Sequence, residues 1–216
     1  MEVFIIRILV IGGGKFIKED IAKSIINECD IIIAADGAGK YLYDLDVMPD
    51  ILAGDFDTLE RNILDFYKRK KVNICEFSPI KDKSDLELSI DLAIEYNPKE
   101  IIIIGALGTR MDHSLSNIML LFHVLDKNIN VKLIDNNNEI IPIKDEIIID
   151  SGKYEYVSLL PIFDDLSGVE LKGFEYESDN LYIKKSSTLG ISNKIKKDKA
   201  SIKIKSGKGL VILSND

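Results

Sequence analysis

Tryptophan is missing from this sequence, cysteine and histidine occur only twice each, and acidic residues outnumber basic ones. Cys29 and Cys75 are too few and too far apart for a disulfide framework, so we expect a reducing, cytoplasmic environment. With only His113 and His123 to add to them, a zinc site is not expected. The net charge of −8 argues against the broad basic surface that nucleic-acid binding requires. Small molecules are therefore the expected partners.

Long hydrophobic runs are also missing. The run from Val3 to Ile11 is interrupted by Arg7 and is far shorter than the ~20 residues of a membrane span, so we expect no membrane association. It leads straight into Gly12-Gly13-Gly14, without the small-residue cleavage pattern of a signal peptide. No G-x-x-x-x-G-K-S/T motif is present, which excludes an ordinary P-loop kinase.

Up to about residue 135, short runs rich in β-branched residues alternate with stretches of helical periodicity. This alternation predicts an α/β domain with a mainly parallel sheet and helices on both faces. The expected helices include Asp85 to Tyr96 and a segment with Leu115, Ile118, Met119 and Phe122 at helical spacing; the expected strands are Phe4 to Ile11, Ile31 to Ala34, Ile51 to Ala53, Asn73 to Glu76, Ile101 to Ile104 and Val131 to Ile134.

The pattern changes around Asp135-Asn136-Asn137-Asn138, after which short alternating runs dominate and no long helix is expected. We therefore predict two domains, 1–136 and 137–216, the second an all-β antiparallel sandwich or barrel that is jelly-roll-like. Its expected strands are Tyr154 to Leu160, Leu181 to Lys184, Ala200 to Lys205 and Leu210 to Leu213; its expected turns fall at Ser151-Gly152, Ser167-Gly168, Lys172-Gly173, Ser178-Asp179-Asn180 and Ser206-Gly207.

Aspartates come after successive predicted strands of the first domain. Asp36 follows the second strand, Asp55 and Asp57 follow the third, and Asp85 and Asp112 come after the fourth and fifth. Open parallel sheets bind ligands beyond the carboxyl ends of their strands, so these side chains are expected on one rim. Without cations, carboxylates at that density repel and raise each other's pKa. The cluster predicts a divalent metal ion beside nucleotide phosphates, or an ion-pair network.

The segment Asp55-Phe56-Asp57 has two interpretations. In an extended segment, Asp55 and Asp57 point to the same side and can share one Mg²⁺, while Phe56 points into the core. The alternative is that Asp57 or Thr58 only caps the helix that follows.

The segment Lys81-Asp82-Lys83-Ser84-Asp85-Leu86-Glu87 also has two interpretations. Ser84 and Glu87 fit a capping box, and Asp85 suits the first turn of a helix. In the functional interpretation, Lys81 reaches a phosphate while Ser84 and Asp85 lie where a helix N-terminus meets nucleotide and metal.

The segment GALGTRMDH, from Gly105 to His113, is a glycine-containing connection between a strand and a helix. Arg110 is a candidate for neutralising charge on a transferred group. Alternatively, Arg110 and Asp112 only pair with each other at the surface, and His113 is a capping or core-edge residue. Gly12-Gly13-Gly14 permits close approach to a phosphate, but a glycine turn after a first strand is common.

In their order and spacing, these motifs resemble the thiamine pyrophosphokinase family, whose members transfer pyrophosphate from ATP to the hydroxyethyl oxygen of thiamine. The similarity spans most of the chain. It is carried by Ala35 to Ala38 (family A-D-G-G), Pro49 to Thr58 (P-x-x-x-x-G-D-x-D-S), Lys81 to Asp85 (K-D-x-T-D), Gly105 to His113 with Asn117 beyond (G-x-x-G-G-R-x-D-H, then Asn) and Gly190 to Asn193 (G-x-S-N).

The departures from the family pattern remove no carboxylate and leave the arginine in place. Ala38 and Thr109 replace glycines, Thr58 and Ser84 exchange the two hydroxyl residues, and Lys194 stands where bacterial members often carry an acid.

The resemblance implies an N-terminal α/β catalytic domain that binds ATP, a C-terminal thiamine-binding β-sandwich, and a homodimer with thiamine sites between subunits. It implies Mg²⁺ and the ATP phosphates near Asp36, Asp55, Asp57 and Asp85. It further implies that Lys81, Ser84, Arg110 and Asp112 hold ATP, with Arg110 also catalytic, and that Ser192 and Asn193 shape the thiamine site.

Three other functions stay open. One is a related pyrophosphokinase acting on another alcohol, such as a hydroxymethyl pterin; the G-x-S-N segment and the second domain favour thiamine. Another is a non-catalytic nucleotide or thiamine sensor, which has no need of the whole set of acids and arginine. The last is a dinucleotide-dependent oxidoreductase, which Gly12-Gly13-Gly14 alone suggests; Phe16 and Ile17 stand where the last glycine of its motif would fall.

Overall fold

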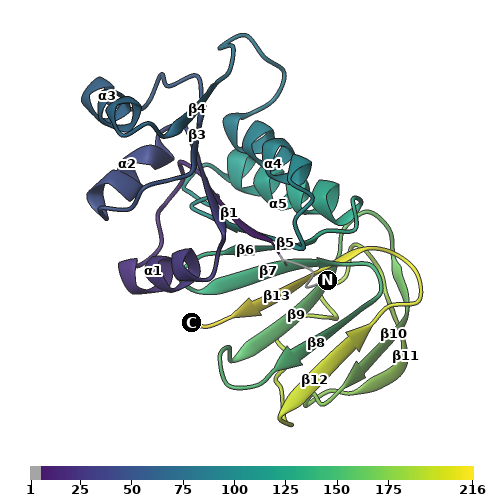
Figure 1. Cartoon of the computed structure of the whole chain (residues 1–216). Coiled ribbons are helices and arrows are strands. Elements are labelled where there is room, and N and C mark those ends of the chain that lie inside the picture. The colour runs from purple at the N-terminus through teal and green to yellow at the C-terminus, as the bar shows by residue number, and fades with distance from the viewer. Residues whose placement is uncertain (1–5) are drawn as a thin grey trace, which may run out of the picture. The chain divides into compact units, whose positions relative to one another are not determined.

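A computed structural model describes residues 6–216, and its contacts divide the chain into two compact units between Asn136 and Asn137 (Figure 1). The first unit is α/β and the second is β-rich, as expected. No helix within residues 6–216 has the length and apolarity needed to cross a membrane.

The strands of the N-terminal unit lie in the order β4-β3-β2-β1-β5-β6, and each neighbouring pair is parallel. They follow the strands expected from the sequence, although Phe4 and Ile5 lie outside the described residues. The elements are β1 (Arg7–Ile11), α1 (Glu19–Asn27), β2 (Ile31–Ala35), α2 (Ala38–Asp44), β3 (Ile51–Gly54), α3 (Arg61–Arg69), β4 (Asn73–Glu76), α4 (Asp85–Glu95), β5 (Glu100–Ile104), α5 (Met111–Leu125) and β6 (Asn130–Ile134).

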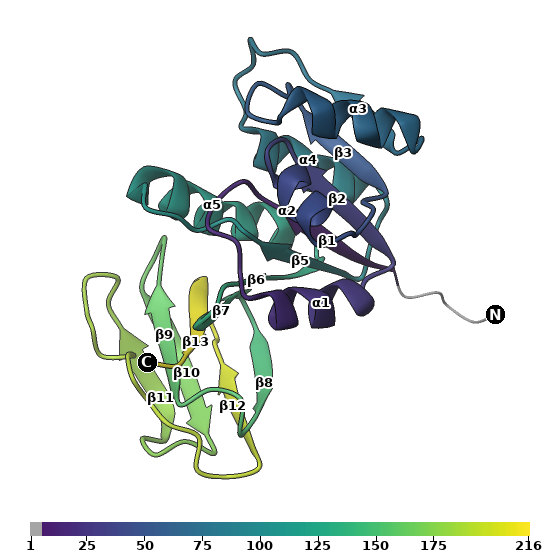
Figure 2. The same cartoon turned by 90° about the vertical axis from the view of Figure 1, so that its left-hand side faces the viewer.

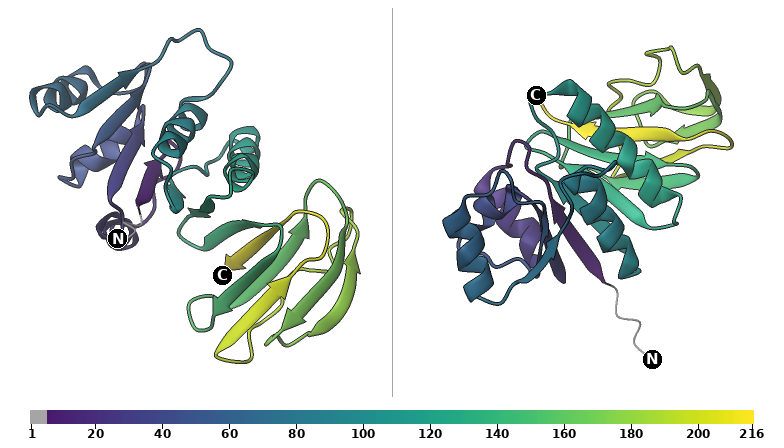
Figure 3. Two further views of the ribbon diagram at one scale, coloured as in Figure 1. Left: turned by 45° about the vertical axis from the view of Figure 1, so that its right-hand side comes forward. Right: turned by 90° about the horizontal axis from the view of Figure 1, so that it is seen from above.

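Helices cover both faces of this sheet. Figures 1 and 3 show α1, α2 and α3 on one side and α4 and α5 on the other, and Figure 2 looks onto the side of α1 to α3. The central strands are therefore covered twice, and Ile8 to Ile11 and Ile101 to Ile104 are all buried.

The buried face of α5 differs from the expected one. The helix forms and Phe122 is buried as expected, but Leu115 and Met119 are exposed, and Leu121 and Val124 are buried in addition to Phe122. An apolar residue in a helix is buried only where a neighbouring element covers it, which periodicity does not determine.

The C-terminal unit consists of two antiparallel sheets, in the orders β7-β13-β9 and β11-β10-β12-β8. Val157, Leu159 and Val211 from the first sheet share one buried cluster with Val169 and Ile202 from the second. The strands are β7 (Asn138–Ile143), β8 (Glu146–Asp150), β9 (Tyr156–Pro161), β10 (Leu166–Lys172), β11 (Ser178–Ile183), β12 (Lys199–Lys203) and β13 (Gly209–Ser214).

Two of the predicted turns in this unit are wrong. Ser178-Asp179-Asn180 begins β11, which is an edge strand where polar residues face water. Ser167-Gly168 lies within β10, at a register shift where Gly168 adopts φ +62°, so its glycine marks a bulge. Strands β7, β8 and β10 were not among the expected strands: β7 contains a proline, β10 contains a Ser-Gly pair, and β8 is only five residues long with an acidic residue at each end.

Candidate functional site

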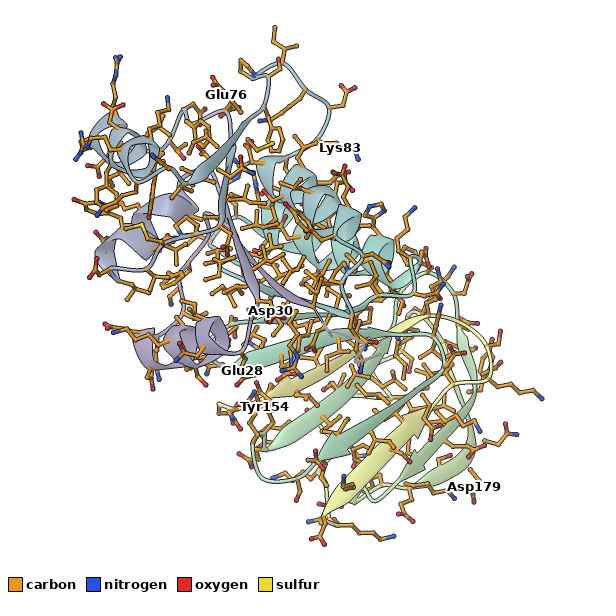
Figure 4. All side chains as sticks on the ribbon, viewed as in Figure 1. Glu28, Asp30, Glu76, Lys83, Tyr154 and Asp179 are labelled. Atoms are coloured by element: carbon orange, nitrogen blue, oxygen red, sulfur yellow. The ribbon has the colours of Figure 1, made fainter. Side chains whose placement is uncertain are left out.

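A pocket of about 460 Å³ opens beside the carboxyl ends of β1 and β5. The strand order runs outward from β1 to β4 on one side and from β5 to β6 on the other, so β1 and β5 flank the point where the order reverses. Ligands of doubly wound folds bind at this point. Figure 4 shows Glu76 and Lys83 at this end of the unit, and Glu28 and Asp30, which precede β2, at the other. The polar side chains lining the pocket include those of Asp36, Thr58, Ser84, Asp85, Arg110 and Asn117.

The glycines after β1 join two loops to each other. Gly14 N–H donates to the Gly105 carbonyl over 2.6 Å, and Lys15 N–H donates to the Leu107 carbonyl over 2.8 Å. A Cβ on Gly12 would lie 2.7 Å from the Gly105 oxygen. Gly12 and Gly14 therefore serve close backbone packing, and the amides of Gly14 and Lys15 are already bonded to protein.

Helix α1 gives no support to the oxidoreductase alternative. It begins only at Glu19, well beyond the glycines, and its first turn carries Glu19 and Asp20. Two carboxylates there would repel a pyrophosphate, whereas dinucleotide-binding folds place the phosphate on the N-terminus of this helix.

Three of the predicted metal ligands lie together. One carboxylate oxygen from each of Asp36, Asp55 and Asp57 falls within 4.8 Å of the other two. Asp36 is buried, Asp55 is half-buried and Asp57 is exposed, so the group leads from the interior to the surface. Asp85, the fourth predicted ligand, lies outside this group.

Asp55 and Asp57 approach each other through a turn and not through an extended segment. Phe56 has φ +59°, in the left-handed region, and its ring packs against the core as expected. Helix α3 begins at Arg61 with Glu60 as its N-cap, so the alternative that Asp57 or Thr58 caps this helix is wrong. Backbone strain of this kind concentrates at functional sites.

The buried carboxylate of Asp36 has one satisfied and one unsatisfied oxygen. Its Oδ2 accepts a hydrogen bond from the Thr58 hydroxyl, whereas Oδ1 is buried and has no hydrogen-bond partner among the described residues. An unpaired buried carboxylate oxygen is costly, and a hard cation such as Mg²⁺ is coordinated by such oxygens. The donor set of Asp36, Asp55 and Asp57 fits a magnesium ion.

Lys81 connects Asp55 to Asp85. Its Nζ lies 2.9 Å from Asp55 Oδ2 and 2.5 Å from Asp85 Oδ1, and all three side chains are at least three-quarters buried. Ser84 Oγ accepts a hydrogen bond from Glu87 N–H over 3.2 Å, which confirms Ser84 as the N-cap of α4. Lys81, Ser84 and Asp85 thus lie together at the start of this helix.

The charges of this cluster shift the pKa values of two carboxyl groups, Asp55 and Asp57, in opposite directions. The hydrogen bond from Lys81 holds the pKa of Asp55 below its ordinary value. The neighbouring charge of Asp55 raises the pKa of Asp57. The cluster therefore favours a further positive charge beside Asp57.

Arg110 and Asp112 pair with each other at the surface. Arg110 Nη2 lies 2.6 Å from Asp112 Oδ2, and both side chains are about two-thirds exposed. Arg110 also lines the pocket, whereas Asp112 is not among the lining residues. An exposed pair is worth at most ~1 kcal/mol, so a phosphate can recruit this guanidinium at little cost.

Asn117 and Ser114 hold the loop after β5 against α5. Asn117 Nδ2 donates to the Ala106 carbonyl over 2.7 Å, and Ser114 Oγ accepts from Gly108 N–H over 3.1 Å. His113 lines the pocket next to this loop and has an exposed side chain.

Ser192 and Asn193 lie in the C-terminal unit. Ser192 has φ +59°, and its N–H donates to Ser158 Oγ over 3.0 Å. The amide of Asn193 makes two hydrogen bonds to the backbone of Tyr176, accepting from its N–H over 3.1 Å and donating to its carbonyl over 2.9 Å. Lys194 pairs with Glu155 over 2.8 Å.

Two residues of these arrangements were missed by sequence reasoning. Thr58 was assigned a place in the family motif and a helix cap as its alternative role, yet its hydroxyl bonds to Asp36, 22 residues away. Tyr176, held by Asn193, carries no motif of its own. Both contacts join segments distant in sequence, so no local signal was available for either.

Comparison with known proteins gives matches along most of the chain. A family model described as "Thiamin pyrophosphokinase, catalytic domain" matches residues 22–133, and one described as "Thiamin pyrophosphokinase, vitamin B1 binding domain" matches residues 144–211. A thiamine pyrophosphokinase of Bacillus subtilis is 32% identical over 96% of this chain and 98% of its own. Thiamine pyrophosphokinase 1 of Arabidopsis thaliana is 27% identical over 91% of this chain and 73% of its own. A crystal structure of the Bacillus subtilis protein superposes with a TM-score of 0.87 at 29% identity, covering 97% of this chain and 99% of that one.

Proposed function

Because the chain belongs to the thiamine pyrophosphokinase family, we propose that it transfers the pyrophosphoryl group of ATP to the hydroxyl of thiamine, giving thiamine pyrophosphate and AMP. The observation that carries the proposal is the acidic group beside the pocket, with the unpaired Asp36 Oδ1, in a chain whose two parts match the two domains of one enzyme family.

In this proposal, residues 1–136 form the ATP-binding catalytic domain and residues 137–216 form the thiamine-binding domain, a β-sandwich of jelly-roll type. The positions of the two family matches support this division. A homodimer with thiamine sites between subunits, and a cytoplasmic location, belong to the proposal as well. The first rests on the resemblance, and the second on the scarcity of cysteine.

Asp36, Asp55 and Asp57 would hold Mg²⁺, and Lys81 would connect Asp85 to this group through Asp55. A bound magnesium ion offsets the negative charge of the phosphates that repels an incoming oxygen. The aspartates themselves would position the reacting groups. Asp36 lies in the interior, whereas Asp57 lies at the surface, where a phosphate can approach.

Lys81, Ser84, Arg110 and Asp112 would hold ATP. The largely buried ammonium of Lys81 pairs with the pocket residue Asp85, and the exposed guanidinium of Arg110 lines the pocket. Arg110 reaches phosphate by exchanging its carboxylate partner, and there it stabilises charge on the transferred group. Ser84 lies at the N-terminus of α4, which favours negative charge.

Ser192 and Asn193 would shape the thiamine site. Asn193 acts through Tyr176, since the two hydrogen bonds of its amide hold the backbone of that residue. The thiamine hydroxyl oxygen then forms a bond to the β-phosphorus of ATP, and the bond between the β-phosphorus and the AMP oxygen breaks. We assign no general base, because a loose transition state needs little proton removal until late.

The test is to incubate the purified protein with ATP, Mg²⁺ and thiamine and to identify the products by mass spectrometry. We expect thiamine pyrophosphate and AMP in equal amounts. ADP as the nucleotide product would contradict pyrophosphoryl transfer. A product only from a hydroxymethyl pterin would support the related pyrophosphokinase, and binding of both ligands without turnover would support a sensor.

A further inference from the structure

We infer that Thr58 is a positioning residue of the acidic group, whose hydroxyl turns the carboxylate of Asp36 so that Oδ1 faces a cation. The inference rests on the proposed function, since it assumes that Asp36, Asp55 and Asp57 hold a divalent ion. Thr58 lies in the loop after β3, and its Oγ1 donates to Asp36 Oδ2.

The backbone leaves Asp36 no freedom to choose another position. Asp36 has φ +46°, and the residue is only 9% exposed. A Cβ on Gly54 would lie 2.9 Å from the Asp36 Cβ. Strand β3 therefore packs so closely against Asp36 that only a glycine fits at position 54. What remains undetermined is the orientation of the carboxylate plane.

The Thr58 hydroxyl determines that orientation. Because it engages Oδ2, the other oxygen, Oδ1, is the one left buried without a hydrogen-bond partner among the described residues. Asp36 contributes a carboxylate oxygen within 4.8 Å of ligand atoms on Asp55 and Asp57. Groups that hydrogen-bond a metal-ligating carboxylate fix its direction, and their loss typically weakens metal affinity by about 10- to 100-fold.

Gly37 makes room for this hydroxyl. A Cβ at Gly37 would lie 2.7 Å from Thr58 Oγ1 and 3.7 Å from Thr58 Cβ, so a methyl group there would strike the hydroxyl first. Gly37 has φ −57°, which alanine adopts without strain. The substitution Gly37→Ala therefore displaces the same hydroxyl by a second route.

The experiment measures Mn²⁺ binding to the nucleotide-free full chain, by the paramagnetic resonance signal of the free ion. Mn²⁺ stands in for Mg²⁺ because both prefer carboxylate oxygens. We expect Thr58→Val and Thr58→Ala to weaken Mn²⁺ binding about tenfold or more, and Thr58→Ser, which keeps the donor, to stay within about threefold of wild type. Circular dichroism checks that each variant is folded.

A double-mutant cycle separates the hydroxyl from general disturbance of the loop. Gly37→Ala should weaken Mn²⁺ binding in the wild-type background and have no further effect in Thr58→Ala, where no hydroxyl remains to be displaced. Additive losses from the two substitutions would contradict a shared action through this hydroxyl.

Failure of the inference and failure of the proposed function give different results. If Asp36→Asn abolishes Mn²⁺ binding while Thr58→Val binds like wild type, Thr58 has no positioning role and the cation site stands. If the folded wild type binds no Mn²⁺, or if Asp36→Asn binds it normally, the cation site itself is overturned and the role of Thr58 with it.

Discussion

Lys81 Nζ lies 2.5 Å from Oδ1 of Asp85, the first residue of α4, and the same nitrogen lies 2.9 Å from Asp55 Oδ2. The ammonium group thus supplies positive charge to the edge of the acidic group. Burial lowers the pKa of Lys81, but its hydrogen bonds to Asp55 and Asp85 outweigh this and raise the pKa above the ordinary value. Lys81 is charged wherever the protein is folded near neutral pH.

Replacing Lys81 with methionine should make stability depend on magnesium. Without Mg²⁺, Asp55 and Asp85 lose their shared partner, and we expect the free energy of unfolding to fall by ~2 kcal/mol. A cation bound nearby should restore much of this loss. The measurement is urea denaturation with and without Mg²⁺. Lys83→Met is the matched control, because Lys83 pairs with Glu87 and Asp91 outside the acidic group; an equal response of both variants to Mg²⁺ would contradict the prediction.

Asp57→Asn should lower turnover by at least about 100-fold, which corresponds to ~2.7 kcal/mol of transition-state stabilisation. Asp57 is exposed, so the fold should be retained. The measurement is the rate of AMP formation with saturating ATP and thiamine, with circular dichroism to check folding. Asp44→Asn, an exposed acid at the end of α2, controls for the loss of one charge. Normal turnover in folded Asp57→Asn protein would remove Asp57 from the site.

Asn193→Ala should raise the KM for thiamine by about tenfold while changing the KM for ATP much less. The substitution removes both hydrogen bonds that hold the Tyr176 backbone, each worth ~1 kcal/mol, so the loop beside Ser192 loses its fixed position. Steady-state kinetics with each substrate varied in turn checks this. Lys194→Met, which removes the pair with Glu155 and the contact with the Tyr156 ring but leaves both Asn193–Tyr176 hydrogen bonds in place, is the control. An equal rise in both KM values would count against the placement of thiamine.

Asp91 should contribute stability that acid removes. Burial raises the pKa of Asp91, but hydrogen bonds from Lys83 and His123 outweigh it and lower the pKa below the ordinary value of 3.8. Because the folded-state pKa is lowered, the Asp91 carboxylate stabilises the fold fully above pH 3.8, the ordinary pKa. This stabilisation is lost as the pH falls through the folded-state pKa.

We therefore expect Asp91→Asn to lower the free energy of unfolding by ~1 kcal/mol at pH 6, and the difference from wild type to shrink as the pH falls below the ordinary pKa. Denaturation by urea at a series of pH values measures it. Glu95→Gln removes one negative charge from the same helix, at an exposed residue without a partner among the described residues, and should show no such pH dependence. If the difference in unfolding free energy between wild type and Asp91→Asn were the same at all pH values, the stabilising role of the Asp91 carboxylate would be contradicted.

Much of the fold was predictable because the signals are local. The β-branched run from Ile101 to Ile104 and the cap at Ser84 are properties of a few adjacent residues, and both appear in the structure as expected. Strands β7, β8 and β10 were missed, because β7 contains Pro142 and β10 contains Ser167-Gly168, which are typical of turns, and β8 is a short run between two acidic residues. Periodicity likewise predicted helix α5 but not its buried face, which depends on the elements that cover it.

The candidate site was likewise predictable only in part. Local sequence was sufficient to place Asp36, Asp55, Asp57 and Asp85 beyond strand ends, because strand direction and the position of a residue in its loop are encoded nearby. It could not determine that Lys81 would join Asp85 to Asp55, that the Thr58 hydroxyl would engage one oxygen of Asp36, or that Asn193 would hold Tyr176. These contacts join segments brought together only by folding, and hydrogen-bond direction depends on distances of a few tenths of an ångström that no residue type specifies by itself.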